Sequence, residues 1–456
     1  MFNSGRTNEQ RPGRQRGPGA WPLFLVIFIW VLLALLLFTV LGWLWGNGGY
    51  WSWDRLLTNW RDVSDSATTS LDLVKVSLTT IGGIGGVGYL VIKYRERASA
   101  ERTEAAAELE RAEQKLLTAV QQLGSASPQV RISGVYSLAD TADIYRGDYR
   151  QRVVDILCGY LRTKRGEWVT PTDAEDGDDK IYVSDDGAVE STILEVLARH
   201  LRKRREATEH HPEVVQEVQD EQLWCNCSID LHGAILAERP NFHHATFNYG
   251  TDFGGAIFTQ GAIFWGANFT QGAYFGNAIF AQRVIFWGAS FTLDTDFGDA
   301  TFTQEADFWA ANFTQEANFG DANFTQEANF GGTTFTQEAN FGDAIFSRRA
   351  DFGGTTFTQD IDFGGTTFTQ EADFRGVTFT QNADFQSAIF NVDYQESGDS
   401  ITFPRSMLLD RITGLPQGAR WAKFDENGNI LRIIEDDSPD MATEGNESGG
   451  EDPTVQ

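Results

Sequence analysis

The chain has 456 residues, which is enough for two or three domains. Its formal net charge of −28 argues against nucleic acid as a direct partner, because binding to nucleic acid relies on cations that neutralise phosphates. The three cysteines, Cys158, Cys225 and Cys227, do not make a disulfide framework and favour a reducing compartment.

The N-terminal region predicts a membrane anchor. Residues 1–20 are polar, basic and rich in Pro and Gly, which predicts disorder. Residues 21–45 are apolar without a charge, long enough to cross a bilayer, and carry Trp at both ends, where interfacial aromatics lie. A signal peptide is the alternative, but the apolar core is too long and no clear cleavage site follows. We therefore expect a transmembrane helix.

A second apolar segment, residues 74–94, is rich in glycine and follows a short loop at 46–73. Gly82 and Gly86 have the G-x-x-x-G spacing that allows helices to approach closely. The segment is interpreted either as a second transmembrane helix or as an apolar stretch that packs on the first. Basic residues flank the pair, so the positive-inside rule puts both termini in the cytoplasm and the loop outside it. We thus expect a multi-pass protein of the cell inner (cytoplasmic) membrane, with the lipid bilayer as a partner.

Residues 95–123 predict a membrane-proximal helix with apolar residues three and four positions apart. One interpretation is an amphipathic helix that packs on the next domain. The other is a short coiled coil that makes a homo-oligomer together with Gly82 and Gly86. The apolar positions are Leu109, Ala112, Leu116, Ala119 and Leu123.

Residues 124–222 predict a small helical domain, with helices at 130–144, 149–161 and 189–205. An acidic loop, 173–186, precedes the last helix. The end of that helix is basic, and it is either a solvated helix end or a contact for anionic lipid head groups. Its cations are Arg199, Arg202, Lys203, Arg204 and Arg205.

From Leu231 to Phe390 a hydrophobic residue, nearly always Phe, returns after alternating steps of five and six residues. Such a fixed short period indicates a solenoid. A small residue lies two positions before each anchor, and positions two apart share a face of an extended segment, so both point inward. Each unit is predicted to be a short extended side followed by a polar corner. The predicted core ladder comprises Phe253, Phe264, Phe275, Phe286, Phe297, Phe308, Phe319, Phe330, Phe341, Phe352, Phe363 and Phe374.

An eleven-residue period can also indicate a right-handed helical coil. On an α-helix, however, steps of five and six residues place successive Phe side chains about 140–240° apart, so no apolar face forms. Gly, Asn, Asp and Thr are also poor helix formers. The repeat therefore predicts β-structure.

The unit Ala311-Asn312-Phe313-Thr314-Gln315 resembles the pentapeptide-repeat family. The resemblance implies a right-handed quadrilateral β-helix with four short sides per coil. The extra residue in alternate units is a departure and gives about 22 residues per coil rather than the usual twenty or so. Thirty anchors over four sides then make about seven coils, or roughly 34 Å of rod. The preceding segment, 122–161, resembles the helical part of membrane-anchored actinobacterial members.

The repeat domain is expected to span residues 223–395, because the next anchor position holds Glu396. Residues 396–435 predict a short helix and a hairpin that turns at Asn427–Gly428. This cap would cover the open end of the rod, which otherwise offers unpaired strand edges. The acidic tail, 436–456, is predicted to be disordered.

No catalytic, metal or cofactor site is expected. Cys225, Cys227, His232, His243 and His244 lie close in sequence, but their spacing matches no usual zinc pattern. A catalytic acid–base pair needs two carboxylates in different environments, and no catalytic motif is present. The repeat instead places glutamates in equivalent environments at Glu305, Glu316, Glu327, Glu338 and Glu371.

The remaining functional feature is the surface of the rod, where residues 231–393 carry 19 acidic and 5 basic side chains. We expect a membrane-anchored, non-catalytic scaffold that presents this rigid rod to an unidentified cytoplasmic protein partner. The alternative, implied by the fluoroquinolone-resistance members of the family, is an acidic DNA mimic that binds a DNA-handling enzyme such as gyrase. Those members are soluble dimers that pair through the ends of their rods. In this chain, by contrast, further segments adjoin both ends of the rod. The candidate partner-binding residues lie at the aligned corners: Gln304, Glu305, Gln315, Glu316, Gln326, Glu327, Gln337 and Glu338.

Overall fold

The chain is described by a computed structural model that divides into two compact units, Met1–Arg111 and Ala112–Gln456. The predicted disordered tails and nearly all of the first apolar segment lie outside the described residues. The described residues are 67–170, 180–205, 214–394 and 414–434, with single positions at 28, 29, 32, 35, 36, 403, 407 and 409–411.

Helix α3, Ala67–Leu123, is one continuous helix of 57 residues. It covers the end of the predicted loop, the second apolar segment and the membrane-proximal helix together. Among the helices that the structure describes, none is both long enough and apolar enough to cross a membrane. The prediction of a second span at 74–94 is therefore unsupported, since its many glycines add little hydropathy and charged residues follow from Lys93.

The helical domain contains α4 (Pro128–Tyr145), α5 (Asp148–Leu161) and α6 (Gly187–Leu201). Within the second unit, Leu116, Ala119 and Leu123 of α3 are buried in one core cluster with residues of these helices. This end of the predicted seam is thus used to pack the helix on the domain, whereas Leu109 is exposed.

A hairpin of β1 (Gly166–Val169) and β2 (Ile181–Ser184) lies between α5 and α6. The sequence prediction missed it: β2 falls inside the stretch expected to be an acidic loop. Its four residues alternate too briefly beside a run of acidic residues to indicate a strand.

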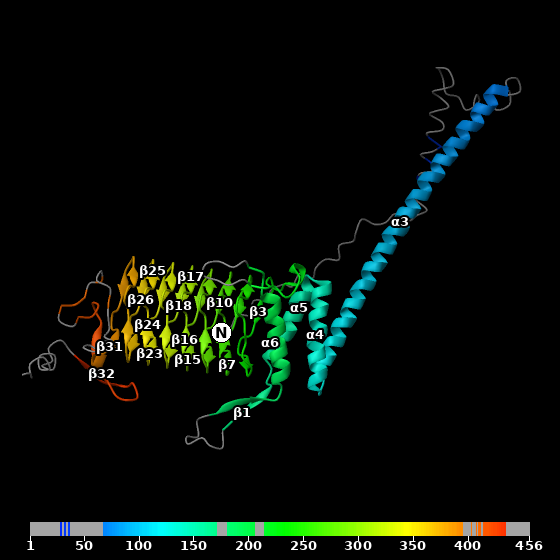
Figure 1. Ribbon diagram of the computed structural model, residues 1–456. Helices are drawn as coiled ribbons and strands as arrows, with labels where there is room; N and C mark the ends of the chain where they lie inside the picture. The colour runs from blue at the N-terminus through cyan, green and yellow to red at the C-terminus, as the bar shows by residue number, and fades with distance from the viewer. Residues whose placement is uncertain are drawn as a thin grey trace, which may run out of the picture. The chain divides into compact units, whose positions relative to one another are not determined.

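Residues 229–391 form a β-solenoid whose strands lie on four sides (Figure 1). Each strand pairs in parallel with the one 22 residues further along, as Ala273 does with Thr295. About seven turns of about 22 residues are present, so the fold predicted from the repeat is confirmed.

The strands of each side are as follows. Side 1 contains β3 (Ile229–Asp230), β6 (Thr251–Asp252), β10 (Ala273–Tyr274), β14 (Thr295–Asp296), β18 (Ala317–Asn318), β22 (Ala339–Asn340), β26 (Ile361–Asp362) and β30 (Ala383–Asp384). Side 2 contains β4 (Ile235–Leu236), β7 (Ile257–Phe258), β11 (Ile279–Phe280), β15 (Thr301–Phe302), β19 (Asn323–Phe324), β23 (Ile345–Phe346), β27 (Thr367–Phe368) and β31 (Ile389–Asn391). Side 3 contains β8 (Ala262–Ile263), β12 (Val284–Ile285), β16 (Ala306–Asp307), β20 (Ala328–Asn329), β24 (Ala350–Asp351) and β28 (Ala372–Asp373). Side 4 contains β5 (Thr246–Phe247), β9 (Asn268–Phe269), β13 (Ser290–Phe291), β17 (Asn312–Phe313), β21 (Thr334–Phe335), β25 (Thr356–Phe357) and β29 (Thr378–Phe379).

The interior of the rod is filled by phenylalanine, and all twelve residues of the predicted core ladder have 0% exposure. Phe330 stacks on Phe308 at 4.9 Å and on Phe352 at 5.1 Å between ring centroids, nearly parallel in both cases. Parallel stacking is imposed by the spacing of the strands, although aromatic rings prefer offset or edge-to-face contacts. Phe319 and Phe341 supply the edge-to-face contacts, each at an interplanar angle of 89°.

Two kinds of corner explain the alternating step. In the five-residue steps the second residue after Phe adopts a left-handed conformation, as Asp321 (φ 56°) and Gly332 (φ 66°) do. Gly, Asp and Asn tolerate that conformation best. The six-residue steps contain the Thr-Gln-Glu corners instead. There the threonine hydroxyl donates to a carbonyl of the preceding coil, as Thr325 does to Phe302 at 3.2 Å. These corners hold the extra residue that lengthens the coil.

A buried ion pair inside the helical domain, between Arg165 and Glu190, contacts the first coil. Arg165 also donates to the carbonyl of Ile235 at 2.7 Å, and Glu190 accepts from the backbone of Glu238 at 3.0 Å. Burial raises the pKa of Glu190 although the guanidinium opposes that shift. The rod and the helices therefore share one continuous core.

At the other end, β32 (Arg420–Phe424) adds in parallel to β31, and β33 (Ile430–Ile434) pairs with β32 in the predicted hairpin. The turn contains Gly428 with φ 84°. The hairpin thus extends side 2 and leaves no free edge on β31. The short helix expected before it lies largely outside the described residues.

We predict that Phe330→Ala lowers the free energy of unfolding by about 3–5 kcal/mol, because it opens a cavity among five rings. Gln337→Ala, at an exposed corner, should change stability by less than about 0.5 kcal/mol. Urea denaturation of both variants measures the difference. Equal midpoints would contradict the inward packing of the ladder.

Candidate interaction surface

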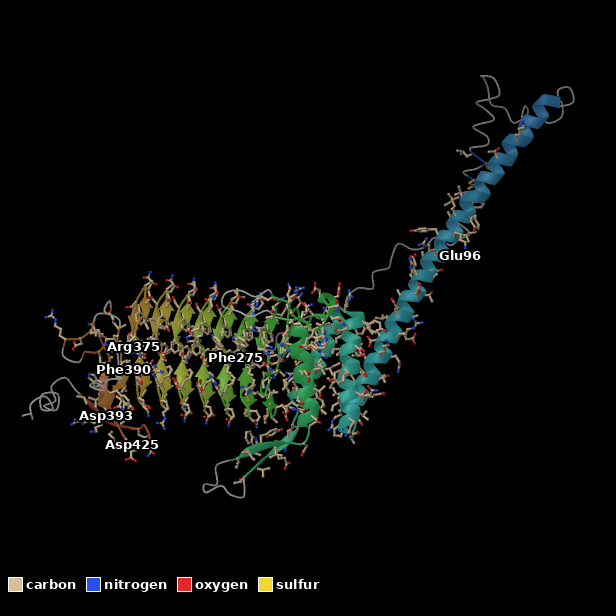
Figure 2. All side chains as sticks on the ribbon, viewed as in Figure 1. Glu96, Phe275, Arg375, Phe390, Asp393 and Asp425 are labelled. Carbon is tan, nitrogen blue, oxygen red and sulfur yellow. The ribbon has the colours of Figure 1, made fainter. Side chains whose placement is uncertain are left out.

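The candidate partner-binding residues do not lie together. Each coil runs from side 1 to side 4 in order, so sides 1 and 3 lie opposite each other across the rod. Four of the eight residues, Gln315, Glu316, Gln337 and Glu338, precede strands of side 1. The other four precede strands of side 3: Gln304, Glu305, Gln326 and Glu327. Figure 2 shows the rows of side chains along the corners, and the eight residues divide between two of these rows.

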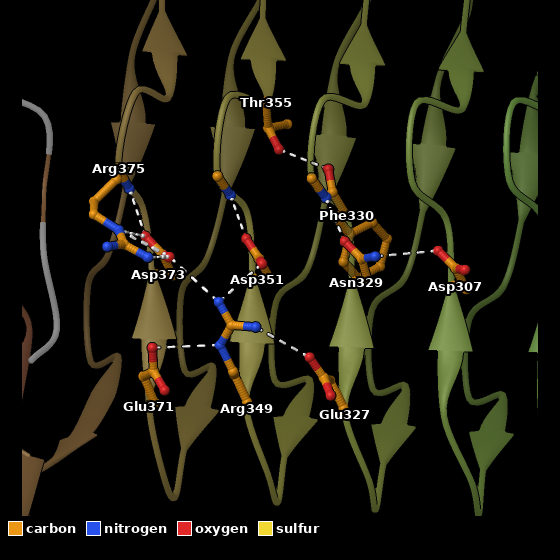
Figure 3. Close-up of polar contacts among 12 residues, drawn as sticks. Asp307, Glu327, Asn329, Phe330, Arg349, Asp351, Thr355, Glu371, Asp373 and Arg375 are labelled. Carbon is orange, nitrogen blue, oxygen red and sulfur yellow. Dashed lines mark hydrogen bonds and ion pairs between the residues drawn. The ribbon is translucent and has the colours of Figure 1, made fainter. Parts of the chain in front are cut away.

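Side 3 carries a cluster of ion pairs centred on Arg349, which precedes β24 (Figure 3). Its guanidinium lies 3.1 Å from Glu327, 3.0 Å from Asp351 and 3.3 Å from Glu371. It also lies 3.5 Å from Asp373 of the next coil. One cation thus spans three coils and offsets part of the negative charge of carboxylates that the repeat stacks on one another. Together these five residues are the Arg349 cluster.

Asp373 is the most constrained carboxylate of the cluster, with 4% exposure. Burial alone would raise its pKa, but hydrogen bonds from Arg375 and the charge of Arg349 outweigh it, so the pKa of Asp373 lies below its usual range. The Arg375 Nε lies 2.9 Å from one carboxylate oxygen and 3.0 Å from the other. Side 3 repeats the motif at Arg283, which contacts Glu305 at 2.8 Å.

From β14 onward, side 1 and its two flanking corners carry carboxylates without such compensation. None of them forms an ion pair with any lysine or arginine among residues 214–394. All five basic residues of the rod (Arg239, Arg283, Arg348, Arg349 and Arg375) lie beside side 3. We call this surface the acidic side; it comprises Asp294, Asp296, Asp299, Glu316, Asp321, Glu338, Asp343, Asp360, Asp362 and Asp384.

The acidic side is built by the same corners that shape the coil. Glu316, Glu338 and Asp360 end the six-residue corners, while Asp299, Asp321 and Asp343 occupy left-handed positions of the five-residue corners. Stacking at about 5 Å places like charges close enough to repel by roughly 0.8 kcal/mol per pair in water. In the sequence, the position of each arginine within the 22-residue coil indicates which side of the rod it lies beside. The net charge of the rod does not contain this information.

Comparison with protein families identifies the rod. The family described as pentapeptide repeats (9 copies) matches residues 231–279, 286–334, 308–356 and 352–393. Residues 231–279 and 286–393 are pentapeptide repeats. No curated protein and no solved structure matches the chain.

The three cysteines precede the pentapeptide repeats in the chain and are buried. Burial raises the pKa of Cys225 to about 11 and the pKa of Cys227 to about 12. His244 packs on Trp265 instead, at 4.7 Å between ring centroids. The five residues tested for zinc from the sequence therefore do not form one group.

One group of potential metal ligands occurs among the described residues: Asp230, His232 and Asp252, in the first coils of the pentapeptide repeats. Sequence reasoning missed it because Asp252 lies one coil away from Asp230. The Arg162 guanidinium lies 2.8 Å from Asp230 and 3.1 Å from His232. A protein cation therefore already pairs with Asp230 in this group.

We predict that Arg349→Met lowers the free energy of unfolding at pH 7 by about 1–2 kcal/mol, because it leaves stacked carboxylates uncompensated. Arg348→Met removes the same charge from an exposed neighbour without an ion pair among the described residues and should cost less than about 0.5 kcal/mol. Urea is the suitable denaturant, because guanidinium salt would screen the charges.

The difference should also depend on pH. The pKa of Asp373 is lower in the folded state, so its contribution is present above the unfolded pKa and is lost as pH falls through the folded pKa. The difference in the free energy of unfolding between the wild type and Arg349→Met should therefore shrink below about pH 4. A gap that stays constant from pH 7 to pH 3 would contradict an electrostatic role for Arg349.

Proposed function

We propose that the chain is a membrane-anchored, non-catalytic scaffold whose acidic side binds a basic surface of a cytoplasmic protein. The observation that carries this proposal is the separation of charge between sides 1 and 3. Pentapeptide-repeat β-solenoids are generally structural or interaction proteins, and a rigid rod presents a long surface at little cost in conformational entropy.

The contrast between the two sides supports a functional origin for the acidic side. Both are built from the same repeat, and both stack carboxylates from coil to coil. On side 3, Arg283 and Arg349 relieve the repulsion, which shows that the fold accommodates arginine at these corners. On side 1 the equivalent corner positions hold Glu316, Glu338 and Asp360 without a cation. Uncompensated charge of one sign favours a partner of the opposite sign and speeds its association.

Attachment to the inner membrane rests on the sequence of residues 21–45 and 74–94. The first is long, apolar and uncharged, and the basic residues on either side of the pair favour cytoplasmic termini. In this proposal the helical domain and the rod both lie in the cytoplasm. A tether of this kind restricts the rod to the layer next to the membrane and raises its effective concentration toward membrane-bound partners.

The acidic side also favours a second candidate, mimicry of DNA toward a DNA-handling enzyme such as gyrase. A row of carboxylates repeating at about 5 Å offers negative charge along a line, as a phosphate backbone does. The two candidates share the chemistry of the contact and differ in the partner. Inhibition of gyrase supercoiling by the purified chain would favour mimicry.

The test compares two triple variants of the full-length chain. Glu316→Gln, Glu338→Gln and Asp360→Asn neutralise the acidic side, and Glu305→Gln, Glu327→Gln and Glu371→Gln make the matched change beside side 3. We expect the first set to reduce crosslinking of partners in native membranes by roughly tenfold, as three lost charge contacts imply, and the second to leave it unchanged. Partner binding should also weaken as salt rises.

Thermal melts of both variants establish that each remains folded, and a chain without the repeats is the background control. Partners retained equally by both variants would contradict the assignment of the acidic side. The same preparations test the tether, because an anchored chain stays with the membrane pellet after an alkaline carbonate wash. Recovery in the soluble fraction would refute the tether.

A further inference from the structure

Three tryptophans form a row on the outer surface of the rod, at the corner that joins side 3 to side 4. Trp265, Trp287 and Trp309 each follow the inward phenylalanine of a side 3 strand, in three successive coils. The rings of Trp265 and Trp287 stack at 5.4 Å between centroids, and Trp309 continues the row at 5.4 Å from Trp287. Trp287 and Trp309 are 41% and 46% exposed. Contiguous exposed apolar surface is a feature of interaction sites.

The fold of the rod does not require tryptophan at this corner. In the two coils after Trp309 the same position holds Gly331 and Gly353, and a Cβ at Gly331 would lie 3.2 Å from Cδ1 of Trp309. The backbone pairing is the same with either residue. The Gly288 amide donates to the Trp309 carbonyl at 2.8 Å, and the Gly332 amide donates to the Gly353 carbonyl at 2.9 Å. Packing of the coils therefore does not explain the three tryptophans, which we call the tryptophan row.

The surface beside the tryptophan row is apolar or uncharged. On side 3, Ile263 and Ile285 are half-buried, and the carboxylate of Asp307 pairs with Arg283 at 3.3 Å. A ligand without charge therefore suits this corner, in contrast to the acidic side. The neighbouring side 4 strands present uncharged hydrogen-bonding side chains: Asn268, Ser290 and Asn312.

The tryptophan row offers hydrogen-bond donors. An indole N–H donates and cannot accept. Among the residues that the structure describes, no group accepts a hydrogen bond from the indole N–H of Trp265, Trp287 or Trp309. A second copy of the row would set donors against donors, so the row does not suit self-association. The complementary surface is apolar and carries acceptors.

We propose that the tryptophan row binds a proline-rich segment of another protein in the polyproline II conformation. Proline has a backbone carbonyl but no N–H, so a run of prolines is an apolar surface whose backbone polar groups are all acceptors. In polyproline II these carbonyls form no internal hydrogen bonds and remain available to a donor. Aromatic side chains recognise such segments in other folds, because the conformation is preformed and loses little entropy on binding.

The spacing of the coils matches the pitch of polyproline II. Trp265 and Trp309 are two coils apart, or about 9.6 Å along the rod. Polyproline II has three residues per turn and rises about 3.1 Å per residue, so equivalent residues lie about 9.3 Å apart. Prolines three positions apart therefore meet Trp265 and Trp309 when the segment lies parallel to the rod. An extended strand repeats its face about every 6.8 Å and would fall out of step over the same two coils.

The test measures binding of a fluorescein-labelled decaproline peptide to the purified full-length chain by fluorescence anisotropy. Trp287→Gly combined with Trp309→Gly introduces the residue that the next two coils hold and should raise the dissociation constant at least about tenfold. Tyr274→Asn is the matched control, because Tyr274 is a 49% exposed aromatic residue on side 1 and Asn318 holds its position two coils later. This variant should bind decaproline as the wild type does.

Trp287→Phe tests the hydrogen bond apart from the ring. It keeps an aromatic side chain but removes the N–H, and it should raise the dissociation constant by roughly threefold to tenfold. An unchanged constant would contradict the role of the indole donors. Thermal melts establish that each variant remains folded. The triple variant of the acidic side should bind decaproline normally, so this proposal and the proposed function fail separately.

Two further probes test the chemistry of the ligand. A labelled peptide of ten alternating glycines and serines lacks the preformed conformation and should not bind at concentrations that saturate the chain with decaproline. A linear glucose hexasaccharide, whose sugar rings also stack on indoles, should not displace decaproline. Failure of the wild type to bind decaproline, equal binding by the double glycine variant, or binding of the hexasaccharide instead would overturn the proposal.

Discussion

Parallel pairing at an interval of 22 residues is the constraint on which the rest of this structure depends. Each coil contacts the next through backbone hydrogen bonds such as that from the Phe319 amide to the Asn340 carbonyl, at 2.7 Å. The pairing places each side chain about 5 Å from its equivalent one coil away. For phenylalanine this produces a continuous apolar core, and for asparagine it produces a ladder in which Asn340 donates to Asn318 at 3.0 Å. For carboxylates the same stacking is unfavourable, and each stack must be neutralised or left as a surface of high negative potential.

The two opposite sides of the rod resolve this conflict differently. Arg349 lies within reach of four carboxylates on side 3, whereas the carboxylates on side 1 have no ion-pair partner among the residues described for the rod. Since arginine fits the corner of side 3, its absence from the corner of side 1 is not required by the backbone. The acidic side is therefore the part of the rod that packing and folding do not explain. This uncompensated negative charge is the observation that favours a basic partner.

The core of the rod was predictable from sequence because its signal repeats thirty times and any error of phase would break the pattern. The small residue, Phe and the turn formers each occupy a fixed place, so the inward direction of Phe330 follows from local geometry. The distribution of charge was not predicted, because it depends on which of four sides a corner precedes. Glu316 and Glu327 look alike in sequence but lie on opposite sides. The hairpin formed by β1 and β2 was missed because a strand of four residues such as β2 carries too little pattern to stand out beside acidic neighbours.

The in-register stacking can be tested by joining adjacent coils with a disulfide. Asn318 and Asn340 are paired residues on side 1, whereas Asn329 lies on side 3. Their paired Cα atoms should lie about 5 Å apart, within the range that a disulfide bridges. The double variant Asn318→Cys/Asn340→Cys should form an intramolecular disulfide on mild oxidation, detected by peptide mass mapping, and Asn318→Cys/Asn329→Cys should not. A bridge in the second variant, or none in the first, would contradict the 22-residue coil.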